Sequence, residues 1–176
     1  MAILGIDDFK SKLAGGGARP SLFKATVNFP TFVDANVELT SFLCKQASIP
    51  GSTVGSIEVG FRGRKLKMAG DSRTFTDWSI SVLNDTDFKL YRAFERWMNG
   101  MNNMTDNEGL TNPLDYQVDG FIDHLDRDGN SIKQYTFRGV FPTTLGDIAL
   151  DYGTANAIES FDVTLSYQWF ETDTTT

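Results

Sequence analysis

The chain has 176 residues, 40% hydrophobic and 12% aromatic, which predicts one domain with a sizeable core and argues against disorder. Its 16 Lys and Arg face 23 Asp and Glu, and this net charge of −7 disfavours nucleic-acid binding by the surface as a whole. One cysteine excludes an intrachain disulfide, and no apolar run is long enough to predict a membrane-spanning helix.

The N-terminal segment is predicted to be an arm. Apolar side chains near helical spacing predict a short amphipathic helix over residues 3–13, and the glycines of AGGGARP predict a flexible joint after it. We therefore expect an arm and joint at 1–17, a single β domain at 18–170 and a polar tail at 171–176.

Strand signals dominate the next part of the chain. Alternating or β-branched and aromatic runs predict five strands, at 22–29, 37–47, 54–61, 64–68 and 73–83. Pro50-Gly51 suits a type II turn, and Gly63 separates the third run from the fourth.

The period then changes to that of a helix. Large apolar residues recur at steps of three and four, which predicts one substantial helix at about 85–102, capped by Asn84 or Asp85 and packed on the core. The polar stretch 99–114 predicts a loop.

Strand signals resume after this loop. We predict strands at 116–126 and 131–141, joined by a turn at Asp128-Gly129. A turn and short strand should follow at 142–153. The last strand, 157–170, should bury the face that carries Phe161, Val163, Leu165, Tyr167 and Trp169. The chain is thus mainly β with one helix.

Catalytic and metal-binding patterns are missing from the sequence. His124 and Cys44 are single residues of their type, and no nucleophile-elbow pattern accompanies them. Residues 126–137 begin like a calcium loop, but Ser131 and Phe137 stand where that loop needs glycine and glutamate. We expect no enzyme activity, no metal and no cofactor.

A basic stretch is the most unusual local feature. Residues 60–75, GFRGRKLKMAGDSRTF, hold nearly a third of the basic residues of an acidic chain. We interpret them as a subunit interface that meets acids on another copy, because oppositely charged patches on one chain favour head-to-tail association. Pairing within the subunit and DNA contact remain alternatives. The interface candidates are Arg62, Arg64, Lys65, Lys67, Asp71 and Arg73.

Several runs together resemble the tail tube family of contractile-tailed bacteriophages. They are ARPSLF, LCKQASIPG, VGFRGRKLKMAGDSRTFTDW, VLND, RGVFPTTLGDIALD and IESFDVTL. The resemblance covers residues 18–170 and is most specific from Val59 to Trp78. Two departures are an extra residue, Ser72, and a distinctive loop at 99–114; they affect surface contacts more than the fold.

The resemblance implies a β-sandwich or barrel-like subunit with a helix packed against it. Six subunits would form a ring, and the rings would stack into the hollow inner tube that conducts DNA into the host. Its implied partners are further copies, the sheath, baseplate, tail-terminator and tape-measure proteins, and duplex DNA in transit. We expect it in the virion, inside the sheath, after synthesis in the host cytoplasm. The alternatives are the tube of an injection device that carries no DNA, and a nucleic-acid-binding module using residues 62–73.

Two further sets of residues follow from this reading. By analogy with the family, ring stacking would involve the arm, the tail and the 47–58 loop, with candidates Ser48, Pro50, Gly51, Val54, Ile57 and Glu58. A bore should not grip DNA, because each phosphate contact adds affinity. Small polar or acidic strand faces are therefore candidate linings, unless they simply face water: Ser79, Ser81, Asp162, Thr164 and Ser166.

Overall fold

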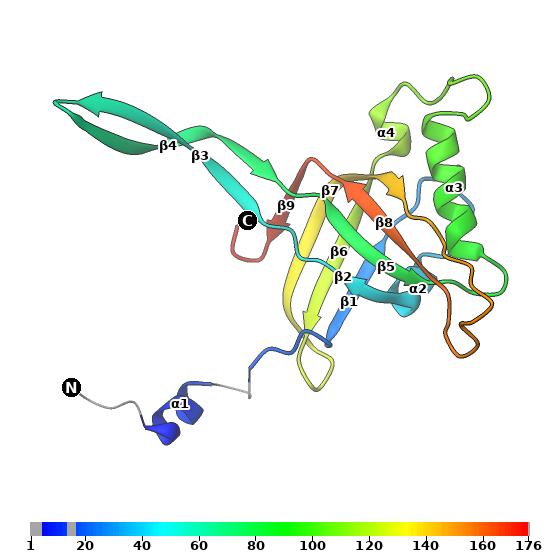
Figure 1. Cartoon of the computed structure of the whole chain (residues 1–176), viewed down its shortest axis with the longest axis horizontal. Helices are drawn as coiled ribbons and strands as arrows, with labels where there is room; N and C mark the ends of the chain where they lie inside the picture. Colours follow the sequence, from blue (N-terminus) through cyan, green and yellow to red (C-terminus); the bar gives the residue numbers. More distant parts are fainter. Residues whose placement is uncertain (1–4, 14–16, 176) are drawn as a thin grey trace.

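A computed structural model describes residues 5–13 and 17–175, and its body is a strongly bent antiparallel sheet. A long hairpin and a short helix project from this body (Figure 1). The body strands are β1 (Phe23–Val27), β2 (Cys44–Ala47), β5 (Trp78–Leu83), β6 (Val118–Leu125), β7 (Ser131–Leu145), β8 (Ser160–Ser166) and β9 (Trp169–Thr172). They follow the order β1-β6-β7-β8-β5-β2, and β9 also pairs with β7.

The long strand β7 divides the sheet into two packed halves. Its first part pairs with β6 and β9, and its last part pairs with β8. The change of direction falls at Gly139, whose φ of 65° favours glycine, and near Pro142. The result is an open sandwich that does not close into a barrel, which confirms the predicted mainly β, sandwich-like fold.

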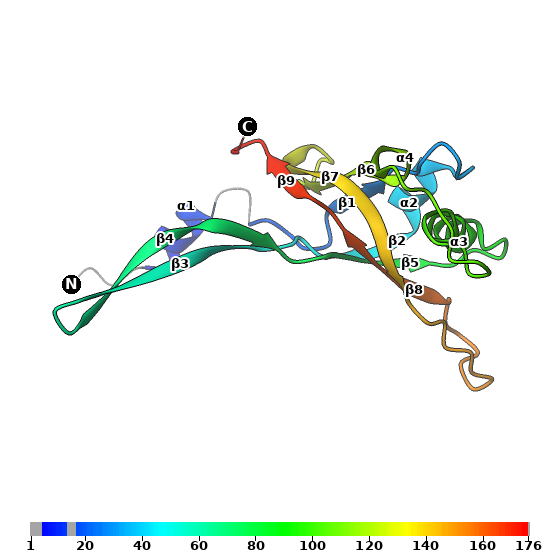
Figure 2. The ribbon, with the colours of Figure 1, turned by 90° about the horizontal axis from the view of Figure 1, so that it is seen from above.

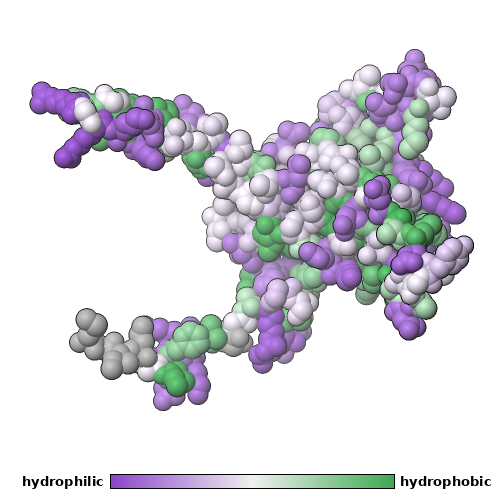
Figure 3. Space-filling model, viewed as in Figure 1, coloured by the Kyte–Doolittle hydropathy of each residue, from purple (hydrophilic) through white to green (hydrophobic). Residues whose placement is uncertain are grey.

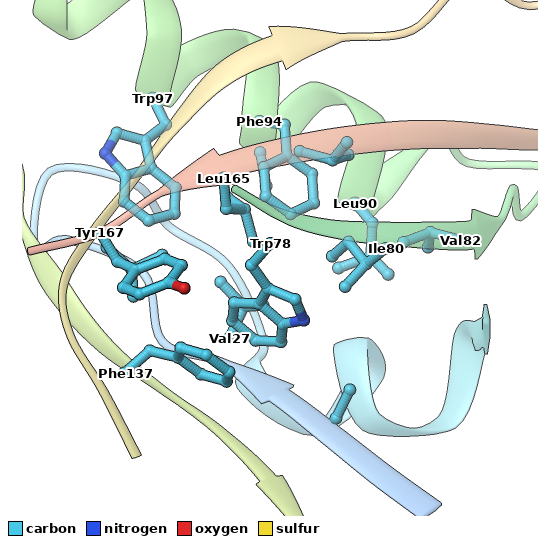
Figure 4. Packing of buried hydrophobic residues seen from close by; sticks show 14 of the residues in the cluster. Val27, Trp78, Ile80, Val82, Leu90, Phe94, Trp97, Phe137, Leu165 and Tyr167 are labelled. Carbon is cyan, nitrogen blue, oxygen red and sulfur yellow. The ribbon is translucent and has the colours of Figure 1, made fainter. Parts of the chain in front are cut away.

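Aromatic side chains fill the space between the two halves (Figure 4). Trp78 of β5 stacks on Phe137 of β7 with ring centroids 4.4 Å apart. Gly120 of β6 lies beside this pair, and a Cβ there would be 2.6 Å from the Trp78 ring. The two halves of the sheet therefore pack closely at Gly120, where the absence of a side chain leaves room for the Trp78 ring.

The predicted alternation of β5 and β8 is confirmed. Trp78, Ile80 and Val82 are buried, as are the alternate residues of β8. The prediction was wrong for Trp169, because the chain leaves β8 at Ser166 and re-enters the sheet as β9. Trp169 is about half exposed as a consequence.

One predicted strand is mostly helix. Residues 37–47 form α2 (Val37–Leu43) followed by the short β2. Asn36 caps the helix by accepting a hydrogen bond from the Glu38 N–H at 2.9 Å. Thr40 and Ser41 donate to carbonyls one turn earlier, so their hydroxyls are satisfied inside a helix despite the strand-like composition.

The predicted long helix is α3 (Lys89–Met101), and it packs on the sheet through Leu90, Ala93, Phe94 and Trp97. Trp97 also donates from Nε1 to the Tyr116 carbonyl at 2.9 Å. The helix begins later than predicted because Phe88 is left-handed, with φ 54°. The N-cap is therefore Phe88 and not the predicted Asn84 or Asp85, although the Asp85 carboxylate accepts the Lys89 N–H at 2.9 Å.

Other boundaries also differ from the predictions. The loop expected at 99–114 ends in a short helix, α4 (Pro113–Tyr116). Of the turn and short strand predicted at 142–153, residues 142–145 form the end of β7, and residues 146–153 form no strand. β9 runs to Thr172, two residues past the predicted domain end. In the arm, α1 (Ile6–Lys12) has no buried residue. Residues 3–4 and 14–16 lie outside the described part of the chain.

Candidate assembly surfaces

The basic stretch forms half of a long hairpin. β3 (Ser52–Phe61) and β4 (Arg64–Phe75) pair with each other and extend away from the body (Figures 1 and 2). Arg62 and Gly63 both have positive φ, 45° and 81°, as a two-residue type I′ turn requires. At the base, the Phe75 ring packs against Phe170 at 5.4 Å, which ties the hairpin to the core.

The hairpin is amphipathic, although nothing in the described chain covers it. Cross-strand partners share a face. This places five apolar residues, each 41–59% exposed, on one side: Ile57, Val59, Phe61, Leu66 and Met68. Figure 3 shows apolar and hydrophilic residues side by side along it. An exposed apolar strip of this kind indicates an interaction surface.

The opposite face of the hairpin carries charge. Lys65 and Lys67 contact the same carboxylate, Glu58, at 3.1 and 3.7 Å. These pairs are exposed, so they add little stability to the subunit. The charges therefore remain available to a partner.

The six interface candidates all lie on this hairpin but do not form one basic patch. Arg62 is in the turn, where its guanidinium lies over the Phe61 ring. Arg64 pairs with Phe61 on the apolar side, while Lys65 and Lys67 lie on the charged side. Asp71 lies in a bulge and Arg73 is closer to the base.

The extra residue Ser72 also falls in this bulge. The pairing shifts between Val54 and Ser56, so Gly55 faces more residues of β4 than a regular ladder allows. A Cβ on Gly70 would lie 2.9 Å from the Gly55 carbonyl oxygen. The close crossing of the two strands therefore requires glycine there.

The ring-stacking candidates are spread over different environments. Val54, Ile57 and Glu58 are exposed on β3. Ser48 bonds to Ser79 and Gly51 bonds to Thr76, so both lie at the hairpin base. Pro50 is buried and offers little surface to a partner.

The channel-lining candidates do share one face. Ser79 and Ser81 of β5 lie opposite Thr164 and Asp162 of β8, on the side away from the core, and Ser166 follows along β8. A shallow pocket on this face also includes Gln46 and Ser48. The sequence prediction missed Gln46 because it merged α2 and β2 into one strand.

An exposed loop at 146–159 was missed as a surface. It is held at its ends by the Gly146 N–H on the Asp162 carbonyl at 2.7 Å and the Asn84 N–H on the Glu159 carbonyl. Leu150, Tyr152 and Ile158 are 72–108% exposed. The signal for this loop in the sequence is apolar residues inside a run with glycine, asparagine and acids, although the same run also predicts a short strand.

Hydrogen bonds organise part of this loop. Asp151 accepts from the Gly153 N–H at 2.8 Å and from the Thr154 hydroxyl at 3.1 Å. These bonds hold the pKa of Asp151 below its ordinary value, so it stays negative at neutral pH. Leu150, Asp151, Ile158 and Glu159 all line a shallow pocket here.

Reactive groups elsewhere are isolated. His124 Nε2 lies 3.0 Å from the Arg19 carbonyl, and burial raises the pKa of the Cys44 thiol to about 11. The described residues contain no cluster of three metal-binding side chains. Within residues 5–13 and 17–175, no helix combines the length and apolarity needed to cross a membrane.

Comparison with known proteins gives a consistent result. A sequence profile described as "phage tail tube protein" matches residues 18–173. The chain is 30% identical to the tail tube protein gp19 of Enterobacteria phage T4 over 168 residues, covering 94% of this chain and 99% of that protein.

Two solved structures share the fold. One is from the anti-feeding prophage baseplate, described as 6-fold symmetrised (TM-score 0.66, 13% identity, 88% of this chain and 94% of that one). The other is from the sheath-tube complex of an extracellular contractile injection system, PVC (TM-score 0.61, 16% identity, 93% and 96%).

Proposed function

Because the chain belongs to the phage tail tube protein family, we propose that it forms hexameric rings that stack into the hollow inner tube of a contractile phage tail. The tube conducts DNA into the host. Members of this family are structural proteins, so the chain is not an enzyme.

The four-stranded half of the sheet, β7-β8-β5-β2, carries this proposal. Six copies of it supply about 24 strands, and strands spaced about 4.7 Å apart give a barrel with a backbone diameter on the order of 40 Å. Such a barrel leaves room for a DNA duplex. Among the described residues β2 pairs only with β5, so its outer edge is free to join a neighbour.

The exposed face of this half-sheet suits a bore. Ser79, Ser81, Thr164 and Ser166 offer small polar groups, and Asp162 adds negative charge. None of these five candidates is basic. A lining of this kind repels phosphate and lets the duplex slide.

The hairpin is the subunit-contact element in this proposal. Its apolar strip is exposed in the single chain, and burial of that strip stabilises an assembly. Pairing inside the subunit accounts for only part of the charge, because Glu58 meets Lys65 and Lys67 but neither Arg62 nor Arg64. Within residues 5–13 and 17–175 neither arginine belongs to an ion pair, so both can pair with acids on another copy.

The partners and location follow the family. We propose contacts with sheath, baseplate and tail-terminator proteins, a tape-measure protein inside the tube, and duplex DNA in transit. Structures described as a sheath-tube complex and a baseplate share the fold, which supports this set. The protein would be made in the bacterial cytoplasm and reside in the virion tail.

A tube that carries no DNA is the second candidate. The solved structures from an anti-feeding prophage and an injection system have the same fold. The sequence relatives favour a phage, since T4 gp19 matches nearly end to end. A nucleic-acid-binding hairpin is less well supported, because its basic residues point to two faces and two of them already contact Glu58.

Electron microscopy of the purified protein at high concentration, together with its mass by light scattering, tests the main proposal. We expect six-fold rings or hollow tubes. If the protein is monomeric, purified baseplate is added as a template, and tubes should grow from it. A chain that fails to polymerise under both conditions is not a tube subunit.

A binding assay separates the nucleic-acid alternative. The monomer is titrated with duplex DNA at low and high salt. The tube proposal predicts no binding, whereas a basic hairpin module predicts binding that weakens steeply with salt.

A further inference from the structure

We propose that the tip of the hairpin on one subunit docks into the pocket of loop 146–159 on a second copy of the chain. This inference rests on the proposed tube and adds which two surfaces meet in it. Phe61 is the apolar anchor, and Arg62 and Arg64 are its charged flanks.

The two surfaces lie at opposite ends of the subunit. Figures 1 and 2 both place the hairpin tip at one end of the longest axis and the loop after β7 at the other end. A single chain cannot bring these ends together without rearranging its body. Contact between two different surfaces on two copies is head-to-tail, and such contacts propagate from one subunit to the next.

The apolar parts of the two surfaces match. Phe61 is 59% exposed at the end of β3, next to the turn. The pocket in the loop is lined in part by Leu150 and Ile158, which are 85% and 72% exposed. Most of the rest of the lining is polar, so the pocket can receive an apolar ring beside charged groups. Aromatic side chains, including Phe, and arginine are enriched in the core of protein interfaces.

The charges match as well. Hairpin residues 52–75 carry five basic and two acidic side chains, and neither Arg62 nor Arg64 belongs to any ion pair found in the described residues. Residues 146–159 carry three acids, Asp147, Asp151 and Glu159, and no Lys or Arg. Two of these acids, Asp151 and Glu159, line the pocket itself. Arginine and carboxylate form strong paired hydrogen bonds when they meet.

The helix α1 is a weaker partner for the tip. It also exposes apolar residues, Ile6 and Phe9. Its two acids in the first turn are, however, balanced by two lysines in the last turn. The helix therefore offers no net charge to attract the arginines.

Crosslinking between two variants tests the contact. In a Cys44→Ser background, one variant carries Lys65→Cys beside the tip, which keeps Phe61 and both arginines, and the other carries Ala157→Cys, which lines the pocket. The two are mixed, assembled with baseplate if needed, checked by electron microscopy and treated with a short bismaleimide. A crosslinked dimer is expected in the mixture and absent from either variant alone. The matched control replaces Ala157→Cys by Leu114→Cys, which is 85% exposed on a different element.

The outcomes separate this inference from the proposed function. If the wild-type protein forms no rings or tubes even with baseplate, the tube itself is refuted. Normal tubes with no dimer, or with as much dimer for the Leu114→Cys control, leave the tube standing and overturn the docking.

Truncation of the anchor gives a second test. We expect Phe61→Ala to raise the protein concentration needed for tube growth by about tenfold or more, as for loss of an interface anchor. Ser56→Ala, on the opposite face of the same strand and outside the apolar strip, should raise it by less than about threefold. Equal effects of the two substitutions would show that the tip holds no anchor.

Discussion

Replacement of Gly120 by alanine tests how tightly the two halves of the sandwich interlock. The new Cβ would lie 2.6 Å from Cζ3 of Trp78 and 3.5 Å from a methyl group of Val140. Trp78 is fully buried and stacked on Phe137, so it has little room to move. The ring would have to shift by roughly 0.8 Å to reach an ordinary contact distance in a close-packed core.

The expected magnitude follows from two opposing terms. Overpacking a core costs about 1–3 kcal/mol. Loss of glycine's freedom in the unfolded chain returns about 0.4–1 kcal/mol. The two terms give a net loss of about 0–2.6 kcal/mol. Because the ring that must move is fully buried, we expect the upper part of this range, about 1–2.6 kcal/mol, which lowers Tm by about 2–10 °C for a chain of this size.

Thermal unfolding followed by circular dichroism measures this effect. The protein must be monomeric by light scattering, because assembly would raise Tm independently. Gly60→Ala is the matched control, since Gly60 also lies in a strand but a Cβ there meets nothing within 4 Å. Its Tm should equal that of wild type or exceed it by up to about 4 °C, because only the unfolded-chain term applies there. If Gly120→Ala melts together with Gly60→Ala, the interlock is not as tight as the geometry requires.

Three further predictions concern single polar groups. A hydrogen bond from Trp169 is the main cause that lowers the pKa of Glu171. The ionised Glu171 carboxylate therefore stabilises the folded state above pH 4.5, and this contribution is lost as the pH falls through the lowered pKa. Glu171→Gln should therefore reduce the fall of Tm at acidic pH. Burial raises the pKa of Cys44 to about 11, so Ellman's reagent at about pH 8 should react much more slowly with folded than with urea-unfolded protein, and equal rates would contradict this. Trp97→Phe leaves the Tyr116 carbonyl unpaired and should cost about 1–3 kcal/mol by urea unfolding, whereas a loss below about 0.5 kcal/mol would show that this hydrogen bond is unimportant.

Elements with a strong side-chain period could be predicted from the sequence. The alternation of β5 and β8 and the three-and-four spacing of α3 locate which residues are buried, because burial on one face is a local requirement on the sequence. The strand predicted at 37–47 was wrong, because local composition and local hydrogen bonds favour different structures there. Its β-branched residues favour a strand, but Asn36 caps a helix there, and the Thr40 and Ser41 hydroxyls are satisfied on carbonyls of that helix.

The candidate surfaces were predicted unevenly. The basic stretch was found as an unusual concentration of charge, and the polar faces of β5 and β8 were found from their alternation. The apolar strip on the hairpin was not predicted to be exposed, because the apolar face of a strand is ordinarily buried in the core. Loop 146–159 was missed because its apolar residues fit a short strand, and nothing local in the sequence shows that the chain leaves the sheet at Leu145.

The sequence by itself determined the family, the mainly β composition, and the strand faces and helix that form the core, because these depend on short-range spacing and on runs of residues typical of one family. Only the tertiary structure decided that β3 and β4 leave the body, that β7 joins both halves of the sandwich, and that the hairpin tip and loop 146–159 lie at opposite ends. The physical reason is that a strand's pairing partners, and hence what remains uncovered, are set by contacts between residues far apart in the chain.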